Sequence, residues 1–264
     1  MRLKYSDTYF RNKLLLIASV FLILITLSCS RSGKDHSIGN DEYIKLGMPD
    51  YRKKWNSDDY AEANITLGTL REKTPLSLPR KSSKKSGEVF ARIINVENLA
   101  FAYDTAIPLN VRAYMIQHYP RIIGEAENLY LVEAKGRIVY AEEYIEILKF
   151  NLNIYHIMLD LSDIIDKSDD ESVAGFKDGK NSVRYFYMQY ITSMTEKVIS
   201  PEIVSSKGFK ELISSVCESV NSNSGWMAAQ DKTTVAAALR NLAEKSGSKA
   251  IRNTLMNSVN SLTK

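Results

Sequence analysis

The most constraining feature of this 264-residue chain is one long segment, residues 142–167, with the sequence EEYIEILKFNLNIYHIMLDLSDIIDK. Its polar residues recur every three or four positions in an otherwise apolar run: Glu142, Glu146, Lys149, Asn153, His156, Asp160, Asp163 and Lys167. At 100° per residue they fall within a sector of roughly 100° on a helix. We therefore expect a central helix that is covered on three sides, and its charges are too frequent for a membrane span.

The polar row of this helix has more than one interpretation. It is a solvated face, or it lines a groove in which His156 and Asp160, four residues apart, hold a metal, a proton or a ligand group. A partner-binding edge is the third possibility. Asn151 lies on the opposite, apolar side and needs a buried hydrogen-bond partner, so we expect it to fix the packing register.

Helical periodicity continues through most of the chain from Glu88 onward. Only six prolines and twelve glycines interrupt it, which favours helices over an all-β fold. The pattern predicts helices near 137–167, 183–198, 208–221, 231–245 and 248–262, with Asp231 as an N-cap, and shorter helices before them. No solenoid period is present, so the predicted fold class is all-α, an irregular helical bundle.

The N-terminus has the layout of a signal peptide. Four basic residues precede an uncharged apolar run at 14–27, which Ser28, Cys29 and Ser30 follow. A helix of that length spans roughly 21 Å, short of the ~30 Å hydrocarbon core, so a permanent transmembrane helix is disfavoured.

The segment Ile25-Thr26-Leu27-Ser28-Cys29 resembles the lipobox of bacterial lipoproteins, although Thr26 and Leu27 stand in the reverse of the family's usual order. The resemblance implies cleavage between Ser28 and Cys29, a diacylglyceryl group such as one carrying palmitate on the Cys29 sulfur, and stable anchoring through two or three acyl chains. With Ser30 next, it implies the periplasmic face of the outer membrane if the cell is Gram-negative. The alternative is an ordinary cleaved secretory signal.

The predicted organisation has three parts. Residues 1–28 form the lipoprotein signal peptide, 29–56 are the lipidated N-terminus and a flexible polar tether, and 57–264 form the helical domain. A linker rich in proline, serine and lysine is expected near 74–87. Its basic residues are solvated or meet anionic lipid head groups.

The charge of the mature chain excludes a nucleic-acid partner. Four of the 35 basic residues and one of the 31 acidic residues precede Cys29, so the formal net charge falls from +4 to +1 after cleavage. Cys217 is then the remaining thiol, and its place at the edge of an apolar stripe predicts a buried free cysteine.

We find no familiar catalytic signature in the sequence. The phosphate-loop, dinucleotide, nucleophile-elbow and zinc-protease motifs are absent, and no cofactor or metal is expected. Carboxylate pairs such as Glu125 and Glu127 are of low specificity. In RYFYMQY (184–190), Arg184 and Tyr185 lie off the stripe of Phe186, Tyr187 and Tyr190, so they are candidate interface anchors; the alternative is that these tyrosines rim the core.

These observations favour a lipid-anchored cell-envelope protein that acts as a binding or assembly module and has an envelope protein as partner. The alternatives are an envelope enzyme acting on cell-wall glycan or peptide, and a small-ligand carrier that uses a groove beside the central helix.

Overall fold

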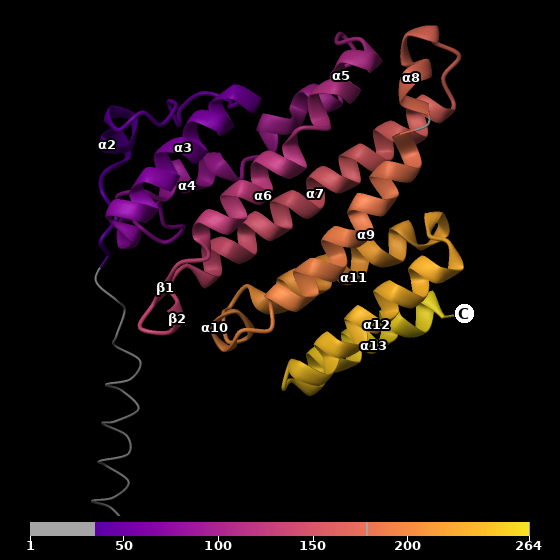
Figure 1. Ribbon diagram of the computed structural model, residues 1–264. Coiled ribbons are helices and arrows are strands. Elements are labelled where there is room, and N and C mark those ends of the chain that lie inside the picture. The colour runs from indigo at the N-terminus through magenta and orange to yellow at the C-terminus, as the bar shows by residue number, and fades with distance from the viewer. Residues whose placement is uncertain (1–34, 178, 264) are drawn as a thin grey trace, which may run out of the picture. The chain divides into compact units, whose positions relative to one another are not determined.

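Helix α7 (Ala141–Asp166) is the element around which the other helices pack (Figure 1). The structure is a computed structural model that describes residues 35–177 and 179–263, and residues from Ser37 onward form one unit. The span of α7 agrees with the helix predicted for 137–167. Fifteen of its side chains are buried, because all but its polar stripe is covered by neighbours.

The described chain is mostly helical, with one small two-stranded sheet, which confirms the all-α fold class. Before α7 come α2 (Asn40–Lys45), α3 (Ser57–Lys73), the 3-10 turn η1 (Pro75–Ser77), α4 (Gly87–Ile93), the 3-10 turn η2 (Val96–Ala102), α5 (Leu109–Ile116) and α6 (Tyr119–Tyr130). After it come η3 (Glu171–Val173), α8 (Ala174–Lys177), α9 (Gly179–Lys197), α10 (Pro201–Val204), α11 (Phe209–Asn223), η4 (Ser224–Trp226), α12 (Ala229–Lys245) and α13 (Lys249–Leu262).

A small hairpin joins α6 to α7. Strands β1 (Glu133–Ala134) and β2 (Arg137–Ile138) pair antiparallel, with Ala134 opposite Arg137. Lys135 and Gly136 form the turn, with φ of 54° and 70°. Positive φ at both central residues is the geometry of a two-residue hairpin loop, and Gly136 adopts it without a steric penalty.

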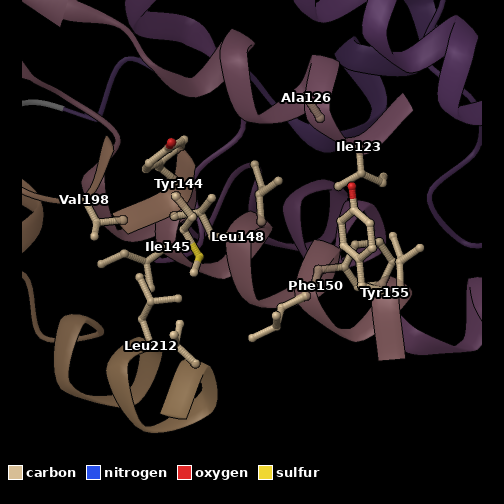
Figure 2. Close-up of a cluster of buried hydrophobic side chains, with 14 of the residues drawn as sticks. Ile123, Ala126, Tyr144, Ile145, Leu148, Phe150, Tyr155, Val198 and Leu212 are labelled. Atoms are coloured by element: carbon tan, nitrogen blue, oxygen red, sulfur yellow. The ribbon is translucent and has the colours of Figure 1, made fainter. Parts of the chain in front are cut away.

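Helices α5, α6, α9 and α11 make the main contacts with α7, and the short helices α8 and α10 also touch it. Helix α3 packs on α6, and α12 and α13 pack on each other and on α9 and α11. Figure 2 shows the result along α7, where Ala126 of α6, Val198 just after α9 and Leu212 of α11 lie around Ile145 and Leu148.

Helix starts follow the expected chemistry, with one correction. Asn56 caps α3, accepting from the backbone of Asp59, whose carboxylate accepts in return from the Asn56 N–H at 2.8 Å. Asp231, predicted as an N-cap, instead lies in the first turn of α12, where its carboxylate accepts from the Ala228 N–H at 3.3 Å. A carboxylate in this first turn also suits the helix dipole.

The segment predicted as a tether differs from that expectation in its described part. Residues 37–56 contain α2 and pack against the helical domain, with Tyr43, Met48 and Trp55 buried. The backbone N–H of Trp55 donates to Asn98 Oδ1 at 3.0 Å. These few large apolar residues, spaced without a regular period, supply the burial that holds an otherwise polar segment in place.

The linker predicted near 74–87 is also packed. Leu78 and Ser86 are fully buried, and the Leu78 N–H donates to the Tyr140 hydroxyl at 3.1 Å. The Lys81 N–H donates to the buried carboxylate of Glu143 at 2.9 Å. Because its backbone N–H groups donate to Tyr140 and Glu143 at the start of α7, this segment is an ordered connection.

Candidate functional site

The predicted lipid-attachment site, Cys29, and the predicted cleavage position after Ser28 lie outside the described residues. The structural unit that follows begins at Ser37, eight residues beyond Cys29.

A cleft of about 470 Å³ lies where α5, the second half of α7, α8 and α9 meet, and we call it the α5–α9 cleft. Its apolar lining consists of Ala113, Ile116, Met158, Leu161, Ile165, Phe176, Gly179, Val183 and Phe186. Its polar lining consists of Gln117, His118, Ser162 and Ser182. Ala113, Met158 and Ile165 are buried, whereas Phe186 is 55% exposed, so the cleft has a buried apolar floor and an open side.

The lining of this cleft is mostly apolar. Among the described residues that line the cleft, none is Asp, Glu, Lys or Arg. The Ser162 hydroxyl donates to the Met158 carbonyl of its own helix at 2.8 Å and is thus already engaged. A mostly apolar concavity of this size with a few polar groups has the usual character of a binding site.

Exposed aromatic rings extend from both sides of the cleft. On α9, Tyr185 is 55% exposed and its ring packs edge-on against Phe186, with centroids 5.7 Å apart. On the α5 side, Tyr114 is 58% exposed and packs edge-on against His118 at 5.1 Å. Large aromatic groups exposed beside a cavity are typical of interaction surfaces.

The structure separates the two α9 residues predicted as interface anchors. Tyr185 borders the cleft, as described, but Arg184 lies in a small hollow between α9 and the start of α12, beside Met227 and Asp231. Its Nε is buried and has no hydrogen-bond partner in the described part of the chain.

Phe186, expected on the core-facing stripe of α9, is exposed. The stripe is centred on Tyr187, Ile191 and Met194, which are buried, and Phe186 lies one residue step of 100° away from Tyr187. The aromatic residue that the sequence assigned to the core is therefore a cleft residue.

The polar row of α7 contributes to a second, shallower concavity. Lys149, Asn153 and His156 face Ser215, Glu218 and Ser222 of α11 across a groove of about 320 Å³. Glu142, Asp160 and Lys167 are exposed, so the polar row is solvated at those positions. Lys149, Asn153 and His156, which lie between Glu142 and Asp160, form one wall of the groove. Burial lowers the pKa of His156, and the charge of Asp160 partly opposes this effect.

His156 and Asp160 each influence the pKa of the other. Burial raises the pKa of Asp160, and His156 opposes that rise. His156 Nδ1 lies 3.5 Å from Asn223 Nδ2 of α11. Within the described residues, no group of three or more His, Cys, Asp or Glu side chains is arranged to hold a metal ion.

A buried polar cluster that the sequence did not single out joins three helices. Asn151 Nδ2 of α7 donates to Glu127 Oε1 of α6 at 2.6 Å, and the Tyr190 hydroxyl of α9 is 3.0 Å from the same oxygen. Asn151 thus has the buried partner it was expected to need. Burial raises the pKa of Glu127, while its hydrogen bonds from Asn151 and Tyr190 oppose that rise.

Cys217 is a buried free cysteine, as predicted. Its Sγ lies 3.9 Å from the Thr254 carbonyl oxygen of α13, and burial raises the pKa of the thiol. A thiol that is buried and held protonated is a packing group rather than a nucleophile.

A search of the described helices for one long and apolar enough to cross a membrane found no candidate. Comparisons of the chain with protein-family models, with curated proteins and with solved structures gave no match.

Proposed function

We propose that this chain is a lipid-anchored cell-envelope protein whose helical domain is a binding or assembly module. The observation that carries the binding role is the α5–α9 cleft, a mostly apolar concavity of about 470 Å³, together with the exposed or half-exposed rings of Tyr114, His118, Tyr185 and Phe186. Leaving such apolar surface in water costs free energy, which a bound apolar group recovers.

The anchoring role rests on the lipobox-like segment that ends at Cys29. Acyl chains on Cys29 supply the membrane attachment, and in a Gram-negative cell the protein faces the periplasm from the outer membrane. The absence of familiar catalytic motifs from the sequence favours binding over catalysis. The partner is an envelope protein that presents an apolar side chain to the cleft.

Replacement of Cys29 by Ala tests the anchor. In cells fed labelled palmitate, we expect the wild-type chain to carry label and to sediment with membranes. The Cys29→Ala chain should carry no label and should retain its signal peptide. Palmitate incorporation by the Cys29→Ala chain would show that the lipobox interpretation is wrong.

Site-specific photocrosslinking in cells tests the binding module. A benzophenone amino acid in place of Phe186 is expected to capture an envelope protein, and the same amino acid in place of Leu46 is expected to capture none. Leu46 is a matched control because it is 53% exposed, close to the 55% of Phe186, and follows α2, outside the cleft. Equal capture at both positions, or capture at neither, argues against a protein-binding role for the cleft.

A small-ligand carrier is the second candidate, and the size of the cleft favours it. A volume of about 470 Å³ lies in the range of pockets that enclose small molecules. The cleft, rather than the His156 groove, is the better site for such a ligand because its floor is buried.

A further inference from the structure

We propose that Glu127 of α6 holds a proton in the folded protein at neutral pH, and that separation of α9 from α6 and α7 releases this proton. The carboxyl group of Glu127 contacts Asn151 of α7 and Tyr190 of α9, so it lies where the three helices meet. Neither lipidation of Cys29 nor occupation of the α5–α9 cleft is needed for this proton to be held.

The surroundings of Glu127 disfavour its charged form. The residue is 3% exposed, and within the described residues no ion pair includes it. An ionised carboxylate at this place has lost its water without gaining a counter-charge, so the neutral acid has the lower free energy. Burial accordingly raises the pKa of Glu127.

The number of hydrogens available around Tyr190 also favours the neutral acid. The Tyr190 hydroxyl oxygen lies 3.0 Å from Glu127 Oε1 and 3.0 Å from the carbonyl oxygen of Leu148. A tyrosine hydroxyl carries one hydrogen, so beside an ionised carboxylate it can donate to only one of these two acceptors. A carboxyl proton on Glu127 supplies the missing hydrogen, because Glu127 then donates to Tyr190 while Tyr190 donates to Leu148.

Three tyrosines and one lysine are the other titratable groups of the described chain that interact with Glu127. Burial, together with the charge of Glu127, raises the pKa of Tyr144 and Tyr155 of α7 and of Tyr190 of α9, so these hydroxyls keep their protons. Lys197 of α9 lowers the pKa of Glu127 without forming an ion pair with it. Glu127 is therefore the group of this cluster that changes charge as the pH rises.

Helix α9 is the least buried of the three helices that meet at Glu127. Four of its 19 residues are buried, compared with six of 12 in α6 and 15 of 26 in α7. Water reaches an ionised Glu127 only if one of these helices moves away, and displacement of α9 exposes the least apolar surface. Ionisation of Glu127 is thus coupled to opening of α9 while α6 and α7 stay packed.

The direction of the pH dependence follows from the two states of α9. Opening returns the pKa of Glu127 toward its ordinary value of 4.5, whereas in the closed state burial holds the pKa above it. Between these two values the closed state keeps a proton that the open state has lost. The opening equilibrium therefore increases about tenfold for each pH unit in this interval and levels off above the pKa of the closed state.

The cleft shares this dependence, because α9 supplies Val183 and Phe186 to its lining and Phe186 lies one turn before Tyr190. Each opening of α9 removes that wall of the cleft. A partner that binds the closed cleft therefore also strengthens the hold of Glu127 on its proton, since linkage is reciprocal. Only this consequence rests on the proposed function.

Amide hydrogen exchange of the full-length protein between about pH 5 and pH 7 measures the opening of α9, once each rate is divided by the intrinsic rate of that amide. In wild type, amides of α9 should be less protected than those of α7, and their opening should increase about tenfold for each pH unit. Glu127→Gln keeps a neutral donor beside Tyr190, so the opening of its α9 should be nearly constant over this range.

Glu143→Gln is the matched control. Glu143 is 4% exposed and burial raises its pKa, but its carboxylate accepts from the Lys81 N–H at 2.9 Å and does not contact α9. Its variant should keep the tenfold dependence in α9. A dependence that survives in Glu127→Gln would overturn the proposal, because another group would then supply the proton. Amides of α9 as protected as those of α7 would also overturn it, because α9 would then open only with the whole domain.

Infrared difference spectroscopy tests the proton itself without reference to α9. At about pH 7, where exposed carboxyl groups are ionised, the spectrum of wild type minus that of Glu127→Gln should contain the carbonyl stretch of a protonated carboxyl group. Urea should abolish this band in wild type. A carboxylate band of Glu127 in the folded wild-type protein would overturn the proposal. Neither measurement needs a partner or a lipid, so failure here is distinct from failure of capture at position 186.

Discussion

The amide of Asn151 donates to the carboxyl of Glu127 across 2.6 Å, in the core where α7 packs against α6. Both residues are at most 3% exposed. Two polar atoms beside this bond, Asn151 Oδ1 and the Tyr144 hydroxyl, are buried and have no hydrogen-bond partner among the described residues. A buried polar group without a partner costs free energy, so these two atoms lower the stability that the cluster would otherwise contribute.

Glu127→Gln is expected to stabilise the fold, and more so as the pH rises. Burial raises the pKa of Glu127 above its ordinary value of 4.5, so the folded state keeps the proton to higher pH than the unfolded state. The wild-type free energy of unfolding therefore falls as the pH rises from about 4.5 through the folded-state pKa. The neutral glutamine avoids this loss and adds a donor, a gain of order 1 kcal/mol at pH 7.

Urea denaturation between pH 4.5 and pH 8 measures the difference in the free energy of unfolding between Glu127→Gln and wild type. Comparison with wild type is needed because burial also raises the pKa of Glu143, which titrates in the same direction. The control is Glu125→Gln, on the solvent side of α6, with an expected change within about 0.5 kcal/mol. A loss of stability in Glu127→Gln at every pH would mean that the cluster requires a carboxylate.

Trp55→Ala is expected to destabilise the domain by about 3–5 kcal/mol. Trp55 is 2% exposed, packs edge-on against Tyr60 at 5.5 Å, and its indole N–H donates to the Asp50 carbonyl at 3.2 Å. Chemical denaturation provides the measurement, and the neighbouring exposed residue provides the control, since Lys54→Ala should change stability by less than about 0.5 kcal/mol. A negligible effect of Trp55→Ala would restore the tether interpretation.

His156 is expected to titrate below its ordinary pKa of 6.5, because burial disfavours the imidazolium. The unfolded state then binds the proton more readily, so the contribution of His156 to stability is lost as the pH falls below 6.5. NMR titration of the imidazole, assigned from its absence in His156→Gln, gives the pKa directly.

We also expect Asp160 to affect the pKa of His156. Asp160→Asn should lower the pKa of His156 further, because the carboxylate raises it. Asp166→Asn is the control, since Asp166 lies on the same helix but pairs with Lys180. If both variants lower the pKa of His156 equally, the effect comes from the change in net charge and not from the proximity of Asp160 at i, i+4.

Cys217 is expected to react slowly with a thiol reagent until the chain unfolds. The side chain is 5% exposed, and burial raises its pKa, so little accessible thiolate is present near neutral pH. The Cys29→Ala chain isolates Cys217 as the sole thiol, and absorbance with a disulfide reagent, with and without urea, follows the reaction. Rapid labelling of the folded chain would identify an accessible cysteine.

The helical architecture could be predicted because its signal is local. The period of polar residues along 142–167 gave the limits of α7 to within a few residues, and the apolar stripe around Val216 gave α11. Burial of Asn151 required a hydrogen-bond partner, but nothing in the sequence around Asn151 specifies which residue it is. Glu127 lies with Ala126 and Tyr130 on the buried face of α6, and this helical spacing is the signal that could have identified it.

The cleft could not be predicted in the same way, because it is a property of packing. Phe186 and Ile165 are 21 positions apart, and no pattern in either helix indicates that the space between them is left open. Phe186, in the exposed wall of the cleft, is expected to face the core from its spacing along α9, so its exposure is not apparent from the sequence. The packing of residues 37–56 could not be predicted because the segment is polar in composition. Three apolar residues without a regular spacing, Tyr43, Met48 and Trp55, are buried and hold it against the domain.

Because residues 37–56 pack against the domain, fewer residues are left to connect the domain to a lipid at Cys29. Eight residue steps separate Cys29 from Ser37, and a fully extended chain of that length spans about 26–29 Å; the 28 steps to Ser57 would span about 92–101 Å. The volume that the domain can explore around its anchor scales with the cube of that radius, so it shrinks roughly fortyfold. A lipidated protein of this design meets molecules of its own membrane at a correspondingly higher local concentration, and it has little reach across the envelope.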